Sequence, residues 1–117
     1  MGYLALDMSS WSGPFTDAEA EAAKAIGGRL VIVNTWGEWC RQQAETTLRH
    51  GLALEAYVYL YFDDDVEAQV RAALEAIRGL PVRMLWLDAE DDTMSVGAAT
   101  IVEKLRRAEE IVTAWSE

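Results

Sequence analysis

Hydrophobic and polar positions change period along the chain, and each change separates a predicted strand from a predicted helix. Apolar runs of strand length are predicted at 3–7, 29–35, 52–62 and 82–90. Apolar residues recur at helical spacing over 18–26, 38–50, about 63–78, and from about 95 onward. This strict alternation predicts four βα units, an α/β fold with a parallel sheet and right-handed crossovers.

Start and stop signals support the predicted helices. Thr16 is predicted to be the N-cap of the first helix, with Glu19 three residues later as in a capping box, and Gly27 and Gly28 are expected to end this helix. The acidic run at 63–65 suits the positive N-terminus of the third helix, which is expected to end at Gly79. The chain is therefore expected to form a single domain over residues 1–117.

The strands differ in how their faces are expected to be buried. The continuous apolar run at 29–35 is typical of a strand buried on both faces, and the short run at 3–7 is also expected to be buried. Because successive strand residues point to opposite faces, several residues of 82–90 share one side. These are Val82, Met84, Trp86, Asp88 and Glu90. Tyr57, Tyr59 and Tyr61 likewise share one face of the third strand.

Three acids stand at the carboxyl ends of predicted parallel strands. Asp7 ends the first strand, and Asp88 and Glu90 end the fourth. Carboxyl ends of parallel strands lie at one edge of a sheet, so these acids are predicted to meet above an aromatic-lined cavity. The alternative is an ordinary acidic loop, since Asp91 and Asp92 continue the run.

Composition removes several classes of function. A net charge of −10 and the lack of a basic stripe in the sequence argue against a nucleic-acid partner. No apolar run is long enough for a membrane span. One cysteine and one histidine exclude an internal disulfide and a multi-cysteine metal site, so no cofactor or metal is predicted. The run at 63–65 lacks the spacing of a calcium loop, and His50 is better explained as a cation at a helix end. The N-terminus does not have the pattern of a signal peptide.

Four segments together resemble one enzyme family. They are DMSSW at 7–11, VIVNTW at 31–36, GLALEAYVY at 51–59 and LWLDAED at 85–91. This set resembles glycoside hydrolase family 25, the lysozyme-like muramidases of peptidoglycan, which have a β/α barrel of the TIM type. The family's first strand ends in Asp followed by Ser, and its fourth ends in Asp-x-Glu. Tyr57 also matches the family pattern, whereas Val58 stands where the family usually has His.

The resemblance implies hydrolysis of β-1,4 glycosidic bonds, with Glu90 as general acid. Asp7 and Asp88 would orient the substrate or stabilise the cationic transition state, and crowding of acids would raise the pKa of one of them. Aromatic faces suit sugar rings, and the candidates for substrate binding are Trp11, Trp36, Tyr57, Tyr59 and Tyr61. The implied partner is a peptidoglycan glycan, and the implied place of action is the cell wall or the exterior of the cell.

The chain supplies four of the roughly eight strands that a barrel of this type needs. It therefore resembles the N-terminal half of the family's barrel, and a homodimer or a missing second half is expected to complete it. A non-catalytic half-barrel that binds carbohydrate or self-associates is an alternative function. A thioredoxin-like monothiol protein that uses Cys40 is a further alternative, although Gln43 occupies the position of the second cysteine.

Overall fold

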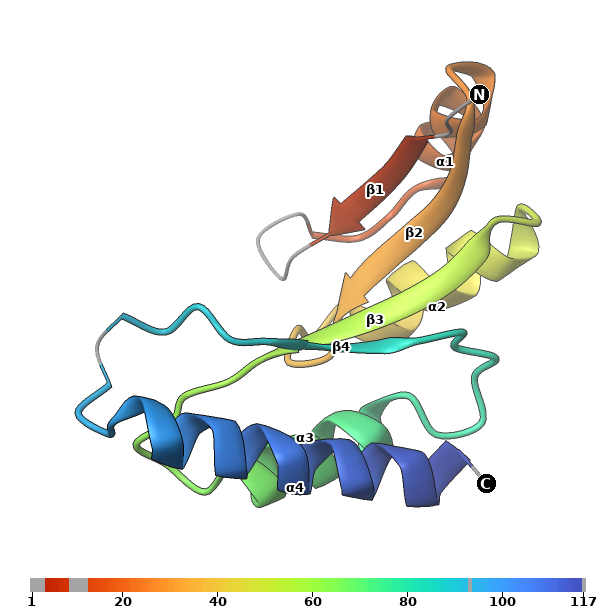
Figure 1. The fold of residues 1–117 in the computed structure, drawn as a ribbon. Helices are drawn as coiled ribbons and strands as arrows, with labels where there is room; N and C mark the ends of the chain where they lie inside the picture. Colours follow the sequence, from red (N-terminus) through yellow and green to blue (C-terminus); the bar gives the residue numbers. More distant parts are fainter. Residues whose placement is uncertain (1–3, 9–12, 93, 117) are drawn as a thin grey trace.

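The computed structural model describes residues 4–8, 13–92 and 94–116, and it confirms an α/β fold in which strands and helices alternate (Figure 1). The elements are β1 (Leu4–Met8), α1 (Asp17–Ala25), β2 (Gly28–Asn34), α2 (Cys40–Arg49), β3 (Ala53–Tyr59), α3 (Val66–Ala76), β4 (Leu85–Asp88) and α4 (Ala98–Ser116). Each predicted strand and helix is present, with ends that differ by a few residues from the sequence pattern.

The strands form one parallel sheet in the order β1-β2-β3-β4. The two edges of the sheet are therefore the first and the last strand of the chain. The register places Asn34 beside Tyr57, Tyr57 beside Trp86, and Tyr59 beside Asp88. Predicted site residues from β3 and β4 thus lie side by side near the carboxyl ends of these strands.

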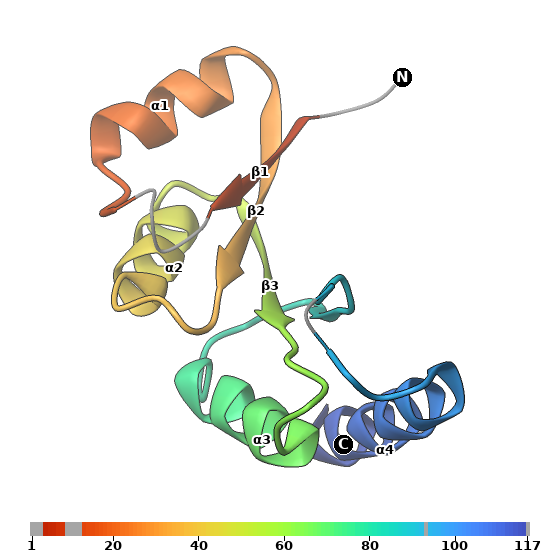
Figure 2. The same cartoon turned by 90° about the vertical axis from the view of Figure 1, so that its left-hand side faces the viewer.

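All four helices lie on one side of the curved sheet, as Figure 2 shows. The core lies between the helices and this covered face. It contains Val31, Val33, Leu54, Ala56, Val58 and Leu60 from the sheet side, and Ala20, Ala44, Val70, Ala73 and Leu74 from the helices. The opposite face of the sheet is called the open face below. It is formed by Ala5, Asp7, Leu30, Ile32, Asn34, Ala53, Glu55, Tyr57, Tyr59, Trp86 and Asp88.

Two predictions about burial are wrong. β2 is not buried along the whole of its open face, because Ile32 and Asn34 are only half-buried there, although Leu30 on the same face is buried. β1 was expected to be buried, yet Leu4 is 48% exposed and only Met8 of this strand is buried. The physical reason is the same for both: the helices cover a single face, and β1 is an edge strand with one neighbour.

The predicted caps are confirmed. Thr16 Oγ1 accepts a hydrogen bond from the Glu19 N–H at 3.1 Å, and Glu19 Oε1 accepts one from the Thr16 N–H at 2.9 Å. Asp65 caps α3 by accepting from the Ala68 N–H at 3.0 Å. Asp63 accepts from the Ser95 N–H at 2.8 Å and fixes the loop before α4. Asp63 and Asp65 therefore have structural roles at turns and helix starts.

His50 follows α2, and its side chain contacts α1. These contacts predict that the stability of the fold depends on pH. Its Nε2 lies 2.7 Å from Asp17 Oδ1, and its Nδ1 lies 2.8 Å from Glu21 Oε1. The hydrogen bond with Asp17, followed by that with Glu21, raises the pKa of His50 above its ordinary value of 6.5. This stabilisation is complete below the unfolded pKa and is lost as pH rises through the raised folded pKa.

Urea unfolding between about pH 5.5 and about pH 8.5 measures the effect. Relative to a His50→Gln variant, the wild-type chain is expected to lose free energy of unfolding as pH rises. Parallel pH profiles for the two proteins would contradict this role for the imidazole.

Candidate functional site

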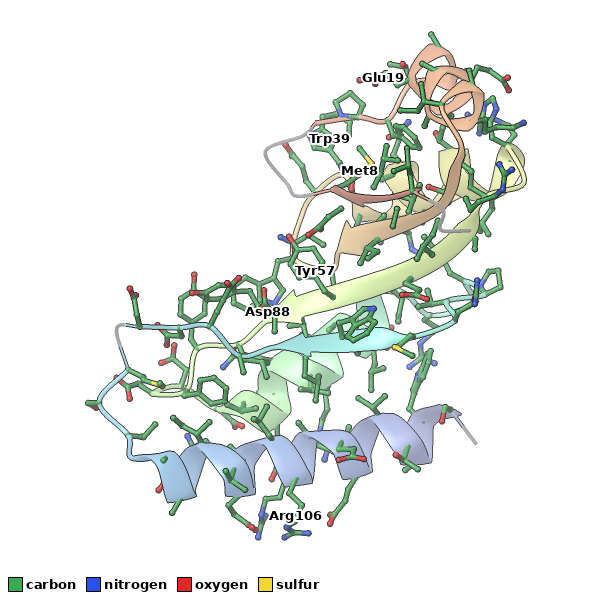
Figure 3. All side chains as sticks on the ribbon, turned by 45° about the horizontal axis from the view of Figure 1, so that its top comes forward. Met8, Glu19, Trp39, Tyr57, Asp88 and Arg106 are labelled. Atoms are coloured by element: carbon green, nitrogen blue, oxygen red, sulfur yellow. The ribbon has the colours of Figure 1, made fainter. Side chains whose placement is uncertain are left out.

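A pocket lies on the open face near the carboxyl ends of the strands. Its volume is about 280 Å³, and it is lined by Asp7, Ile32, Tyr57, Trp86, Leu87, Asp88 and Ala89. Asp7 belongs to β1 and Asp88 to β4, the two opposite edges of the sheet. The curvature of the sheet brings both carboxylates to one pocket. Figure 3 shows the Tyr57 and Asp88 side chains close together at this end of β3 and β4.

Glu90 lies next to this pocket and interacts with its acids. Its carboxyl group lies beside that of Asp88, and hydrogen bonding between the two is the first cause of a raised pKa at Glu90. The charge of Asp88, a small loss of hydration and the charge of Asp7 act in the same direction. Two carboxyl groups can share a hydrogen bond only if one is protonated, so the arrangement favours a proton on Glu90. Asp7, Asp88 and Glu90 are called the acid cluster below.

Tyr57 is on β3, which lies between the edge strand that carries Asp7 and the edge strand that carries Asp88. Partial burial raises the pKa of its hydroxyl, and the charges of Asp7, Asp88 and Glu90 add to the effect, while a hydrogen bond with Asn34 opposes it. The phenol therefore keeps its proton at neutral pH and is available as a hydrogen-bond donor in the pocket.

The other predicted aromatic residues form a separate aromatic patch, defined by Trp36, Tyr59 and Tyr61. The rings of Trp36 and Tyr61 are stacked, with centroids 5.2 Å apart and an interplanar angle of 13°. Tyr59 meets Tyr61 at 5.1 Å in a tilted arrangement. Trp36 is 42% exposed and Tyr61 is 41% exposed, so solvent reaches the patch. Trp11, the remaining aromatic candidate, lies outside the described residues.

The patch is close to the acid cluster. Tyr59 is the register partner of Asp88, and the pKa of its hydroxyl is raised by burial first and then by the nearby charges of Asp91 and Glu90. A ligand that touches both Tyr61 and Asp88 would therefore extend along the carboxyl edge of β3 and β4. Among the described residues, the structure thus divides the aromatic candidates into a pocket residue, Tyr57, and this neighbouring patch of three.

Two residues of the open face had not been singled out as site residues. Trp86 lines the pocket, is 49% exposed, and donates from Nε1 to Glu55 Oε1 at 2.8 Å. Glu55 is 7% exposed although no helix covers its face. The alternation of residues along the strands had already placed Trp86 beside Asp88 and could have placed Glu55 beside Tyr57. Neither residue stood out, because each lies within an apolar run.

The acidic run after β4 has two distinct parts. Asp91 is 4% exposed and accepts a hydrogen bond from the Phe62 N–H at 3.4 Å, so it holds the chain that leaves β3. Asp92 is exposed. The loop interpretation therefore fits 91–92, whereas Asp88 and Glu90 interact with each other and with the pocket.

The described part of the chain gives little support to thiol chemistry at Cys40 or to a metal site. Cys40 is buried at the first residue of α2, and burial raises the pKa of its thiol, which disfavours the reactive thiolate. No group of three or more His, Cys, Asp or Glu residues within 4–8, 13–92 and 94–116 could hold a metal ion. Across the same ranges, no helix is both long and apolar enough to cross a bilayer.

No protein-family model matches the chain, and no curated protein sequence matches it.

Proposed function

We propose that the chain is a glycoside hydrolase-like domain of the muramidase type, which acts on β-1,4 glycosidic bonds of peptidoglycan. The observation that carries the proposal is the pocket that Asp7 and Asp88 line together, with the Glu90 carboxyl group beside Asp88. The raised pKa of Glu90 favours this carboxyl group as the proton donor, with two other acids beside it. Glycoside hydrolysis requires this division of roles.

In the proposed reaction, Glu90 donates its proton to the oxygen of the leaving sugar as the glycosidic bond breaks. Its raised pKa keeps that proton available at a higher pH than for an ordinary glutamate. Asp7 and Asp88 carry the negative charge that stabilises the developing oxocarbenium ion or orients the attacking water. Tyr57 donates a hydrogen bond within the same pocket. No cofactor takes part.

The aromatic patch is the proposed platform for neighbouring sugars of the glycan. Trp36 and Tyr61 present exposed ring surface beside the acids, and such faces bind the apolar faces of sugar rings. Trp36→Ala is therefore expected to weaken binding to insoluble peptidoglycan about tenfold, equivalent to about 1.4 kcal/mol. Co-sedimentation with purified cell walls measures this affinity.

Trp115→Ala is the matched control for this prediction, because Trp115 is exposed to a similar extent, 41%, but lies on α4. Its affinity for cell walls should equal that of the wild-type chain. Equal losses in the two variants would contradict a platform at the patch.

A non-catalytic carbohydrate-binding domain is the second candidate function. It is favoured by one observation: Glu90 does not itself line the pocket that contains Asp7 and Asp88. In this case the acids would accept hydrogen bonds from sugar hydroxyl groups, and no bond would be cleaved.

Incubation with purified peptidoglycan separates the two functions. A muramidase should release new reducing ends without new free amino groups, because it cleaves between sugars and leaves the peptides intact. Co-sedimentation without new reducing ends would support the binding function and exclude hydrolysis by this chain. Release of amino groups would instead indicate cleavage of peptides.

A further inference from the structure

Both edges of the sheet are open in the described part of the chain. β1 pairs only with β2, and β4 pairs only with β3, so each edge leaves a row of backbone groups without a strand partner. Side chains at the edges are also incompletely covered: Leu85 and Leu87 are half-buried, and Leu4 is 48% exposed. Open edges of this kind can pair with another strand.

The open face is apolar between the acids. Trp86 is 49% exposed, and Met84, which precedes it by two residues, is 47% exposed. Leu85 and Leu87 of the same strand face the helices, but no helix covers the open face (Figure 2). Contiguous exposed apolar surface beside unpaired strand edges is typical of a protein interface.

The dimensions of the chain indicate how much surface is uncovered. Its radius of gyration is 15.1 Å, against about 13.4 Å for a compact domain of the same length. Its accessible surface is 6966 Å², against about 6,300 Å² for a compact monomer of this mass. The excess of about 650 Å² approaches the roughly 800 Å² that each partner buries in a standard stable interface.

We propose that a second copy of this chain covers the open face and pairs with both edges. A two-fold axis along the axis of the barrel, to which the strands are tilted, would place β4 of each copy beside β1 of the other, with all strands parallel. This single symmetry operation would pair the backbone groups of both edge strands and close an eight-stranded barrel. Eight strands is the barrel size at which side chains fill the interior. The five residues of β1 and the four of β4 are matched in length for this pairing.

Closure would also complete the packing of α4. Its apolar stripe is only half-buried against α3, with Ala108 as its one buried residue among 98–116. The half-buried members of the stripe are Ile101, Leu105, Ile111 and Val112. In the closed dimer, the junction of β4 with the partner's β1 would lie beside this stripe. At this junction, the acids that end β4 of one copy would lie near Asp7, which belongs to β1 of the other copy.

Charge opposes this association and gives it a recognisable salt dependence. The open face carries Asp7, Glu55 and Asp88 and, among its described residues, no Lys or Arg. Each chain has a net charge of −10. Screening at high ionic strength should therefore tighten the dimer, because the screening length falls from about 10 Å at 0.1 M salt to about 3 Å at 1 M.

Light scattering with small-angle X-ray scattering over a concentration series tests the proposal. We expect twice the 13.0 kDa mass of the chain, a radius of gyration of about 17 to 18 Å, and a dissociation constant that falls with added salt. A mass of one chain at every concentration, in both low and high salt, would overturn the proposal.

Two variants show whether the open face forms the interface. Met84→Glu adds a charge to this face at an exposed position and is expected to give a folded monomer. Ile26→Glu adds the same charge at the end of α1, where the side chain is 70% exposed, and should remain dimeric. Circular dichroism checks that both are folded. A dimer that survives both substitutions equally would overturn the proposed interface, whether or not the chain hydrolyses peptidoglycan.

Discussion

Replacement of Glu90 by Gln is expected to lower the rate of peptidoglycan hydrolysis by about 10²- to 10⁴-fold, the usual contribution of a general acid. The amide keeps the size and hydrogen-bonding capacity of the side chain but cannot give up a proton to the leaving oxygen. Because Glu90 is exposed, the substitution should not disturb the core. Binding to cell walls should therefore persist, and the rate of release of reducing ends measures the loss.

Asp92→Asn is the matched control, since Asp92 is an exposed acid two residues later. It should leave the rate within a fewfold of wild type. The pH profile adds a second readout: activity of the wild-type chain should fall as pH rises through the raised pKa of Glu90. Equal rates for Glu90→Gln and wild type would show that Glu90 is not the general acid.

Replacement of Phe62 by Ala is expected to destabilise the fold by about 3 to 5 kcal/mol, the largest stability effect predicted for this chain. The side chain is 1% exposed and lies just after β3. Its backbone N–H donates to Asp91, and its carbonyl accepts from Lys104 Nζ at 2.8 Å, so β3, β4 and α4 are joined around it. Loss of the ring would leave a cavity where these elements meet.

Urea unfolding measures this loss, with Val102→Ala as the control at a position that is 66% exposed. The control should change the free energy of unfolding by no more than about 0.5 kcal/mol. A loss below about 1 kcal/mol for Phe62→Ala would contradict the central packing position of this ring.

Local signals allowed much of the fold to be predicted. The change of period separated strands from helices, and the capping box at Thr16 and Glu19 marked the start of α1, because both signals arise from neighbouring residues. The helical spacing of apolar residues predicted over 63–78 fits the structure, in which one side of this segment is buried: Val66, Val70, Ala73, Leu74 and Ile77. The shared orientation of Trp86 and Asp88 followed from strand alternation alone.

Features that depend on distant parts of the chain could not be predicted in this way. Burial of β2 on both faces was predicted from its apolar run, but a run of this kind does not reveal that all helices lie on one side. The burial of Glu55 could not be predicted either, because its hydrogen-bond donor, Trp86, is on another strand. Nor could the contacts of His50, whose carboxylate partners lie on α1. The proximity of Asp7 to Asp88 was expected, but the curvature that produces it exists only in three dimensions.

Titration of the Glu90 carboxyl group by carbon-detected NMR tests the central claim most directly, since it reports on the acid cluster without any substrate. We expect a pKa above the ordinary value of 4.5 in the wild-type chain. In Asp88→Asn, which removes the neighbouring charge, the pKa of Glu90 should move down toward that value. An ordinary pKa in the wild-type chain, unchanged by Asp88→Asn, would mean that the acids do not interact and would contradict the proposed general acid.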